Sequence, residues 1–541
     1  MTTVVKGTPP TTPGAGASGT APPVRRLPVL RRRAVQVRLV AGAALVLTAT
    51  LRLVGLQGSG DLFIDELIYR ELGASVVDGG LPATASGLFF LHPPGYFYLQ
   101  AAWASVFGLG PDVVSGVYEF REINALLAGV TAALLVLLVT RARSLPLGAA
   151  AALLFALDPY ILRQNDRVML DTEAMMWVLA GYLVLLPLTR RPQPRPSRVG
   201  ARVCCAGLLF GLALLTKDHT ALITLLPLLL GAALGWGLPR RQMLLTAAVA
   251  VVPYGVYVLV VTLAGHFDEL WFTKTHGVRR LLGLVQETGF NAEQGPPLTT
   301  RLAEEVATFG TTYLLLLLGA VALVVLLRRK DPTSRLLALF QLSAGFTLLY
   351  AVGFGTLEEQ ALYLLVVPTL VAVTVAWPRW PDAPRRARRR LQAVACAGAG
   401  AVLVAVTALS GVSYAQVRTD PDTGFAQLRA YLAAHVPPGT AVGAADGQPT
   451  PGVTQWALKD QYRVGTWITP EERYEHGAHY LVVPWKIVRD GYAPLDEDAV
   501  ERMVSRGRLL FSVDGRTYGT LALYLLPLPG QPSPSAPPGS P

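Results

Sequence analysis

The strongest constraint on this 541-residue chain is a series of long apolar runs that recurs along most of its length. Each run is close to the ~20 residues that an α-helix needs to cross the hydrocarbon core of a bilayer. Backbone groups in lipid must form hydrogen bonds within their own segment, so each run is expected to be helical. Eleven runs occur: Val37–Leu56, Ile123–Thr140, Leu147–Leu162, Val168–Leu188, Val203–Thr216, Thr220–Leu238, Met243–Gly265, Phe309–Leu327, Leu336–Phe354, Ala361–Trp377 and Leu391–Val412.

The basic residues predict how these spans are oriented. They cluster in every second loop, namely at Arg25–Arg33, Arg141–Arg143, Arg190–Arg202, Arg240–Arg241, Arg328–Lys330 and Arg385–Arg390. Loops rich in Lys and Arg stay on the cytoplasmic side, so the N-terminus is expected inside and the C-terminal segment outside the plasma membrane. The formal charge of +11 is therefore assigned to topology and to contacts with anionic membrane lipids, and no nucleic-acid partner is expected.

The composition changes at the ends of this series of spans. Only 15% of all residues are charged, against about 25% in soluble proteins, but the segment after the last span is polar. The predicted organisation is a disordered cytoplasmic tail over residues 1–36, a transmembrane domain over 37–412 with long outer loops at 57–122 and 266–305, an extracytoplasmic α/β domain over 413–526, and a disordered tail over 527–541. Within the first outer loop, apolar residues at helical spacing between Ile64 and Val76 predict an amphipathic surface helix.

Two polar motifs stand in the first outer loop, Asp65-Glu66 and His92-Pro93-Pro94-Gly95. An aspartate with an ordinary pKa of about 3.9 is ionised at neutral pH and can take a proton from a hydroxyl within hydrogen-bond reach. The simpler interpretation of the acidic pair is a favourable charge at a helix N-terminus. Prolines explain a rigid turn but not the histidine, so Asp65 and Glu66 are candidate catalytic residues and His92 a candidate substrate contact.

A second group of charges is predicted at other outer turns. Arg163, Arg167 and Asp171 are spaced four apart, which places them on one face if a helix runs through them. An internal Arg167–Asp171 ion pair is the simpler interpretation, because an unpaired charge in a membrane segment costs at least ~2.5 kcal/mol. The functional alternative is a phosphate site. Its candidate cations are Arg163, Arg167, Lys217 and Lys274, with Asp171 and His219 as further substrate contacts.

Glu358, Glu359 and Tyr363 gather at the start of the tenth run, where they are candidates to bind sugar hydroxyls or simply to cap a helix. Gly-rich nucleotide motifs and His/Cys metal spacings are absent from the sequence, so no cofactor and no metal site is expected. The Asp65-Glu66 pair is compatible at most with a weakly bound divalent cation.

Together these motifs resemble the GT-C membrane glycosyltransferases, particularly the group of protein O-mannosyltransferases and bacterial aminoarabinose transferases. The resemblance rests on Asp65-Glu66 after the first span, His92-Pro93-Pro94, Arg167-Val168-Met169-Leu170-Asp171, and Tyr363-Leu364-Leu365 before Pro368. It implies a polytopic all-α GT-C domain of about eleven transmembrane helices, a polyprenyl-phosphate sugar donor and an inverting transfer. It also implies that Asp65 holds the acidic catalytic position.

The sequence therefore favours a membrane glycosyltransferase that moves a sugar to a hydroxyl of a cell-envelope glycan, lipid or protein acceptor. A transporter or flippase for lipid-linked saccharides is the main alternative, although such proteins often show internal repeats and functional charges in mid-membrane. No repeat is evident in this chain. A non-catalytic assembly scaffold is a third alternative.

Overall fold

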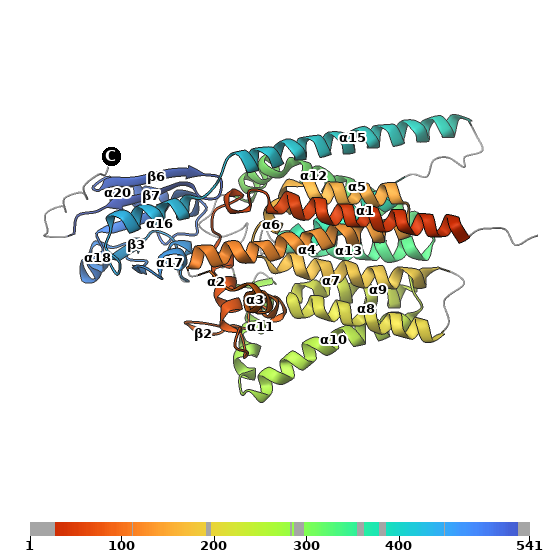
Figure 1. Cartoon of the computed structure of the whole chain (residues 1–541), viewed down its shortest axis with the longest axis horizontal. Helices are drawn as coiled ribbons and strands as arrows, with labels where there is room; N and C mark the ends of the chain where they lie inside the picture. Colours follow the sequence, from red (N-terminus) through yellow and green to blue (C-terminus); the bar gives the residue numbers. More distant parts are fainter. Residues whose placement is uncertain are drawn as a thin grey trace, which may run out of the picture.

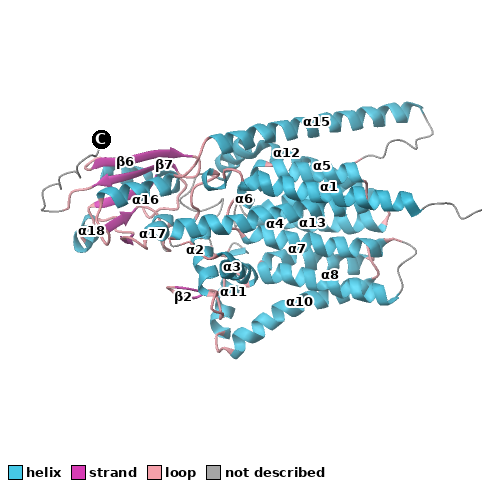
Figure 2. Ribbon diagram, viewed as in Figure 1, coloured by secondary structure: helices cyan, strands magenta, loops and turns pink. Residues whose placement is uncertain are grey.

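The computed structural model describes residues 27–110, 112–190, 196–281, 284–285, 297–353, 362–377, 386–447 and 450–528. The protein is elongated, with a bundle of long helices and a small α/β domain at one end of it (Figure 1). We call this end of the bundle the outer end and the opposite end the inner end. Strands are confined to the α/β domain and one short hairpin (Figure 2).

A helix occurs at each of the eleven apolar runs. The bundle consists of α1 (Leu27–Leu53), α4 (Val113–Ala142), α5 (Leu145–Leu157), α6 (Pro159–Asn165), α7 (Leu170–Leu185), α8 (Pro196–Thr216), α9 (Ala221–Leu234), α10 (Arg240–Leu263), α12 (Leu298–Arg328), α13 (Pro332–Gly353), α14 (Tyr363–Ala376) and α15 (Arg386–Thr419). Because α1 begins at Leu27, it includes the last ten residues of the segment predicted to be a disordered tail.

The helices at the eleven predicted spans differ in length. Among the described residues, seven helices are long and apolar enough to cross a bilayer, or eight if the bent pair α5–α6 counts as one span. The remaining predicted spans include α9 and α14, which are apolar but shorter. Both contain an internal proline, Pro227 and Pro368, which removes one hydrogen bond of the helix. The prediction of a polytopic helical membrane protein with a C-terminal α/β domain is confirmed.

The third predicted span is broken. Helices α5 and α6 meet at an angle of 67°. Asp158 accepts the backbone N–H of Ile161 at 2.9 Å and so caps α6, while Pro159 occupies its first position. A second break separates α6 from α7 at Asp166–Met169. The expectation that Arg163, Arg167 and Asp171 share one helix face is therefore wrong, because no continuous helix joins them.

The outer loops carry surface helices at the outer end. The first loop forms α2 (Ile64–Ser75), a hairpin of β1 (Ala83–Thr84) and β2 (Gly87–Leu88), and α3 (Gly95–Phe107). The second loop forms α11 (Phe267–Leu281). The amphipathic helix predicted between Ile64 and Val76 is thus present, and Figure 1 shows α2 and α3 between the bundle and the α/β domain.

The α/β domain contains a five-stranded sheet in the order β4-β3-β5-β7-β6. Strands β4, β3 and β5 are parallel, whereas β7 runs antiparallel to both β5 and β6. Its elements are α16 (Gly424–His435), β3 (Ala441–Ala444), α17 (Val453–Leu458), β4 (Arg463–Gly465), α18 (Pro470–His476), β5 (Tyr480–Pro484), α19 (Trp485–Arg489), α20 (Glu497–Val504), β6 (Arg508–Gly515) and β7 (Gly519–Leu525).

One hydrophobic core unites the surface helices with the α/β domain. Leu67 of α2 and Phe97 of α3 belong to the same buried cluster as Phe425 of α16 and Leu521 of β7. A separate, larger core fills the helix bundle. The α/β domain is therefore packed on the first outer loop as part of one folded unit, and this contact fixes the loop that carries the acidic pair.

Candidate active site at the outer end

The acidic pair begins helix α2. Phe63 is the residue before the helix, and its backbone N–H donates to Glu66 Oε2 at 3.0 Å, which forms half of a capping box. Two acidic side chains in the first turn are favourable because the helix N-terminus carries partial positive charge. Asp65 is half-buried, whereas Glu66 is fully buried, so the two neighbours have different environments.

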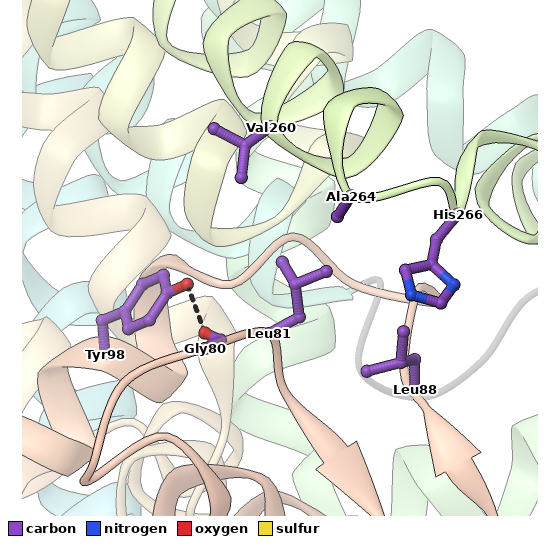
Figure 3. A pocket seen from close by; sticks show the side chains of 7 residues that line it. All are labelled: Gly80, Leu81, Leu88, Tyr98, Val260, Ala264 and His266. Atoms are coloured by element: carbon purple, nitrogen blue, oxygen red, sulfur yellow. Dashed lines mark hydrogen bonds between the residues drawn. The ribbon is translucent and has the colours of Figure 1, made fainter.

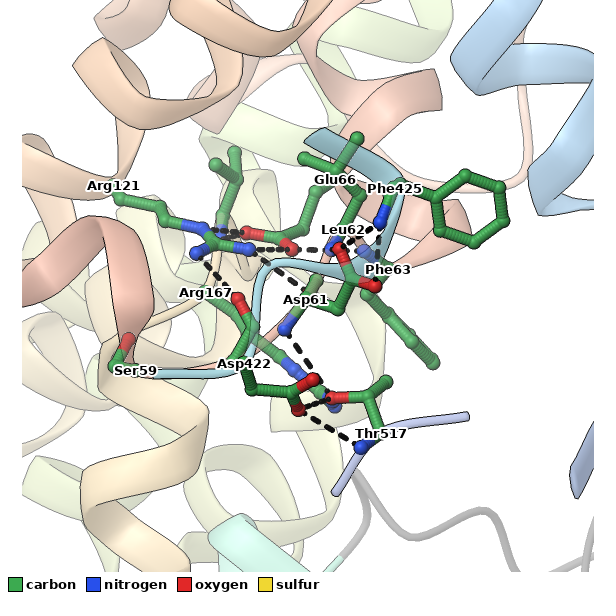
Figure 4. Close-up of polar contacts among 12 residues, drawn as sticks. Ser59, Asp61, Leu62, Phe63, Glu66, Arg121, Arg167, Asp422, Phe425 and Thr517 are labelled. Atoms are coloured by element: carbon green, nitrogen blue, oxygen red, sulfur yellow. Dashed lines mark hydrogen bonds and ion pairs between the residues drawn. The ribbon is translucent and has the colours of Figure 1, made fainter. Parts of the chain in front are cut away.

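Glu66 is bound on every side. Its carboxylate accepts Arg121 Nε at 2.8 Å and Arg121 Nη2 at 2.7 Å, and both side chains have 0% exposure. Glu66 Oε1 also accepts the backbone N–H of Val168 at 2.8 Å. The residue thus ties α2 to α4 and to the break before α7 (Figure 4). Glu66 therefore makes structural contacts through both carboxylate oxygens, and its catalytic role stays a prediction.

The same loop is held by the α/β domain. The Asp61 carboxylate accepts the N–H of Leu62 at 2.8 Å and that of Phe425 at 2.9 Å, and the Tyr518 hydroxyl donates to Leu62 O. Arg121 completes the contact by donating to the carbonyl of Asp61 at 3.1 Å. We call Asp61, Glu66, Arg121, Phe425 and Tyr518 the outer joint, and Figure 4 labels the first four of them. Burial raises the pKa of Asp61 to about 7.

Arg167 lies beside this joint in the break between α6 and α7. Its guanidinium stacks on the Phe63 ring at 4.4 Å from the ring centroid, and the residue is 4% exposed. Asn124 Nδ2 donates to the carbonyls of Arg167 and Met169, at 2.5 and 2.9 Å, and Asn124 Oδ1 accepts the Tyr96 hydroxyl at 3.0 Å. The break that carries Arg167 is therefore anchored by buried side chains of α3 and α4.

Two lysine–aspartate pairs lie at the neighbouring outer turns. Lys217 Nζ donates to both oxygens of Asp171 at 2.9 Å, and Lys274 Nζ contacts Asp218 Oδ2 at 2.5 Å. His219 Nδ1 lies 3.4 Å from Asp218 Oδ1. We call Lys217–Asp171 and Lys274–Asp218 the lysine pairs. The structure thus brings together the predicted residues Lys217, Lys274 and Asp171, although α7, α11 and the α8–α9 turn supply them.

His92 and Tyr69 connect the acidic loop to the lysine pairs. The two rings pack edge to face with centroids 5.9 Å apart. Burial, reinforced by the positive charge of Lys217, lowers the pKa of His92 well below its ordinary value, so the imidazole is neutral. Burial, and then the negative charges of Asp65 and Asp171, raise the pKa of Tyr69. Asp65, Asp171 and Lys217 therefore act on one pair of aromatic rings.

The other predicted residues lie deeper or outside the described chain. Arg163 is half-buried on α6 with its guanidinium over the Phe309 ring. Tyr363 is fully buried, and its hydroxyl accepts Asn165 Nδ2 at 2.8 Å. Glu358 and Glu359 lie outside the described residues. Within the described chain, no group of three or more His, Cys, Asp or Glu side chains could hold a metal ion.

A hollow of about 540 Å³ opens between the first outer loop and the outer end of α10. The residues around it are Gly80, Leu81, Leu88, Tyr98, Val260, Ala264 and His266 (Figure 3). These come from the first outer loop, α3 and the turn between α10 and α11, and most of them are apolar. Lys274 donates to the carbonyl of Leu91 at 2.9 Å, which ties α11 to the loop that forms one wall. The hollow does not include Asp65.

The architecture is shared with known membrane enzymes. ArnT from Cupriavidus metallidurans bound to undecaprenyl phosphate matches with a TM-score of 0.57 at 14% identity, over 90% of this chain and 97% of that chain. The oligosaccharyltransferase of Archaeoglobus fulgidus, tethered with an acceptor peptide, matches with a TM-score of 0.52 at 14% identity, over 89% of this chain and 74% of that chain. This chain has the GT-C fold.

A sequence match points in the same direction. The family model of dolichyl-phosphate-mannose-protein mannosyltransferases matches residues 101–284 of this GT-C chain, about a third of its length. The matched region includes Arg167, Asp171, Lys217 and Lys274 but begins at residue 101, after Asp65 and His92. A comparison with curated proteins gives no match.

Some residues at the site were missed by the sequence analysis. Arg121 and Asn124 are polar residues near the start of an apolar run, and a buried polar side chain in a membrane segment is a usable signal. Arg418, which pairs with Asp166 at 2.8 Å, offered no such signal because it follows the last run. Tyr69 lies on the polar side of an amphipathic pattern, and only the fold shows its contacts.

Proposed function

We propose that this protein is an inverting glycosyltransferase that moves a sugar from a polyprenyl-phosphate donor to a hydroxyl acceptor at the outer end of the bundle. The observation that carries the proposal is the gathering of the Asp65 loop, His92 and the two lysine pairs around one site. A carboxylate beside a group of cations is the combination that such a transfer requires. The resemblance to GT-C enzymes gives the reaction type.

Asp65 is proposed as the general base. The acceptor oxygen forms a bond to the anomeric carbon as the bond between that carbon and the phosphate oxygen breaks. The acceptor proton passes to the Asp65 carboxylate, and the electron pair of the broken bond leaves on the lipid phosphate. Asp65 suits this role better than Glu66, because Glu66 is enclosed by Arg121 and Val168 N–H whereas Asp65 is half-buried.

The phosphate is proposed to bind at the lysine pairs, with Arg163 and Arg167 as the further candidate contacts. A lysine ammonium has three N–H donors, and a carboxylate partner does not use all of them. The remaining donor can bind the phosphate as negative charge develops on the leaving group. Lys274 is the more accessible of the two lysines, with 20% of its side chain exposed against 7% for Lys217. His92 is neutral and lies within reach of their charge, so it suits a hydrogen bond to the sugar or phosphate.

The apolar hollow is proposed to receive the first part of the lipid chain of the donor. It lies where Leu263, Trp271 and Phe272 are exposed on α10 and α11, as expected for helices that meet the membrane interface. ArnT of Cupriavidus metallidurans, with the same fold, is bound to undecaprenyl phosphate. Lys274 donates to Leu91 of the loop that also lines the hollow, so the phosphate of such a lipid is proposed to extend towards Lys274.

The proposed acceptor is a hydroxyl of a cell-envelope glycan, lipid or protein. No resident metal is assigned a role in this proposal, because lysine and arginine side chains supply the positive charge. Turnover is therefore expected to be unchanged by a chelator such as EDTA.

The test is to incubate the purified protein with a panel of polyprenyl-phosphate sugars and to measure release of the lipid phosphate. Release that depends on an added hydroxyl acceptor, with inversion at the anomeric carbon, would support the proposal. Movement of intact lipid-linked sugar across a proteoliposome membrane without release would favour a transporter instead.

The orientation of the bundle is also a proposal, namely that the N-terminus is cytoplasmic and the α/β domain extracytoplasmic. Single cysteines can test it in a variant without native cysteines. Ser59→Cys and Ser505→Cys at the outer end should react with an impermeant thiol reagent in intact cells, whereas Ser197→Cys at the inner end should not. Labelling only of Ser197→Cys would invert the topology.

A further inference from the structure

A second hollow lies at the inner end of the bundle, away from the candidate active site. Its volume is about 250 Å³, below the ~300–1,000 Å³ of pockets for drug-sized ligands. The lining residues are Arg141, Leu186, Pro187, Arg190, Arg202 and Thr333. Arg141 ends α4, Arg190 follows α7, Arg202 lies on α8 and Thr333 begins α13, so four separate segments meet here.

Other arginines at this end serve to complete helices. Arg143 donates to the carbonyl of Trp377, and Arg329 donates to those of Val375 and Ala376 at 2.8 and 2.7 Å. These contacts satisfy carbonyl groups at the C-terminus of α14, which have no partner within the helix. Such arginines have a structural use and give no indication of a ligand.

The arginines around the hollow are different. Arg141 Nη1 donates to Leu183 O at 3.0 Å, and Arg190 Nη2 donates to Arg141 O. Each guanidinium has five N–H donors, so these contacts fix its position and use only a minority of them. Among the residues that the structure describes, no ion pair joins any of the three to a carboxylate.

The positive charges repel one another across the hollow. Those of Arg202 and Arg190 both act on the Arg141 guanidinium, which places the three groups within electrostatic reach. Asp331 is the residue before α13 and lies two positions from Thr333 in the sequence. It is exposed, and its carboxylate accepts the N–H of Ser334 at 2.9 Å. Three cations held together without a counter-charge are stabilised by an anion of matching size, and a phosphate accepts paired hydrogen bonds from arginine.

We propose that Arg141, Arg190 and Arg202 form a binding site for a phosphate group. A phospholipid headgroup of the adjacent leaflet and free inorganic phosphate share this chemistry. The position at the end of a membrane bundle favours the lipid, because anionic headgroups lie at that level and basic pockets between helices suit them. Leu186 and Pro187 give the hollow an apolar side for the glycerol part of a lipid. This site is independent of the glycosyl transfer proposed above.

The test uses the full-length protein in nanodiscs or mixed micelles that contain phosphatidylglycerol or phosphatidylcholine. Bound lipid is counted by native mass spectrometry, and the melting temperature is followed as phosphatidylglycerol is titrated. Saturable binding of phosphatidylglycerol is expected in the wild type, with affinity lowered about tenfold or more in Arg141→Gln/Arg202→Gln. The control is Arg240→Gln/Arg241→Gln, which removes the same charge from exposed positions of the α9–α10 turn and should bind like the wild type.

The remaining arms separate the two sources and keep the test decisive. Inorganic phosphate is added at millimolar concentration as a competitor. If it displaces phosphatidylglycerol from the wild type but has no effect on the double variant, the site is supported and its ligand is a free anion. If Arg141→Gln/Arg202→Gln is unstable without lipid, Arg202→Lys keeps the charge and should bind with intermediate affinity. Equal lipid binding by wild type, double variant and control would overturn the proposal and leave these arginines as topology signals only.

Discussion

The outer joint and the lysine pairs are both sets of buried charges at the outer end, but they differ in how completely protein groups enclose them. Exposure of the side chains rises from 0% for Glu66 and Arg121, through 1% and 7% for Asp171 and Lys217, to 26% and 20% for Asp218 and Lys274. The Glu66–Arg121 pair is fully enclosed, whereas part of the Lys274–Asp218 pair is exposed. The difference teaches that the enclosed pair holds the site together, while the most exposed pair remains open to solvent.

The largest expected effect is that of a substitution at Asp65, the neighbour of Glu66. Asp65→Asn keeps the shape of the side chain and removes its basicity, so turnover should fall by about 10²–10⁴-fold with little change in donor affinity. Steady-state kinetics on correctly folded protein measure this. Asp78→Asn is the matched control, because Asp78 is an exposed carboxylate of the same loop. Near-normal turnover of Asp65→Asn would remove Asp65 as the base.

Substitutions in the outer joint should instead lower the stability of the folded protein. Arg121→Ala leaves the Glu66 carboxylate buried without its main partner, which typically costs about 3–5 kcal/mol in unfolding free energy. Thermal unfolding in detergent is the measurement. The double variant Arg121→Met/Glu66→Leu removes both charges and should recover part of the loss. A melting temperature unchanged by Arg121→Ala would contradict the structural assignment.

Substitutions in the lysine pairs should weaken binding of the donor. Lys217→Met/Asp171→Asn removes both charges, so no buried carboxylate is stranded. Donor affinity should weaken by roughly tenfold, the loss expected for a charge-assisted contact worth about 1.4 kcal/mol. Isothermal titration with a lipid phosphate, beside a melting curve, separates binding from folding. If the variant is less stable but binds the donor normally, the role of Lys217 is structural.

A fourth predicted effect is a pH dependence of the outer joint. The pKa of Asp61 is about 7 in the folded protein against 3.8 as the ordinary value, so between these values only the folded state holds the proton. Stability contributed by Asp61 is therefore complete below pH 4 and is lost as the pH rises towards 7, by on the order of 1 kcal/mol per unit. Asp61→Asn should have a smaller difference in melting temperature between pH 5 and pH 8 than the wild type. Equal differences would exclude Asp61 as the source.

The helices could be predicted from the sequence because each apolar run is local information. The run that becomes α4 is visible without knowing its neighbours, and so is the amphipathic pattern of α2. Charge pairing is not local. Asp171 was expected to pair with Arg167 through helical spacing, but the helix is interrupted at Asp166–Met169 and Asp171 instead binds Lys217, which is 46 residues away.

The candidate site was predictable in part for the same reason. Lys217, Lys274 and His92 were selected one by one from outer loops, and the fold brings them together. The division of labour between Asp65 and Glu66 was not visible, because it depends on Arg121 at a separation of 55 residues. Adjacent residues on a helix face different directions, and only the packing decides which one is enclosed.

The outer joint also constrains the order of events during synthesis. The carbonyl of Leu62 accepts a hydrogen bond from the Tyr518 hydroxyl, and 456 residues separate the two. At ~5–20 residues per second, the ribosome needs roughly 20–90 s to make that interval. During this time the loop with Asp65 is already outside the first span but lacks Asp61's partner Phe425 and the rest of the α/β domain. The nascent chain therefore cannot assemble its proposed catalytic loop until nearly the whole protein has been inserted, so a premature active intermediate is avoided.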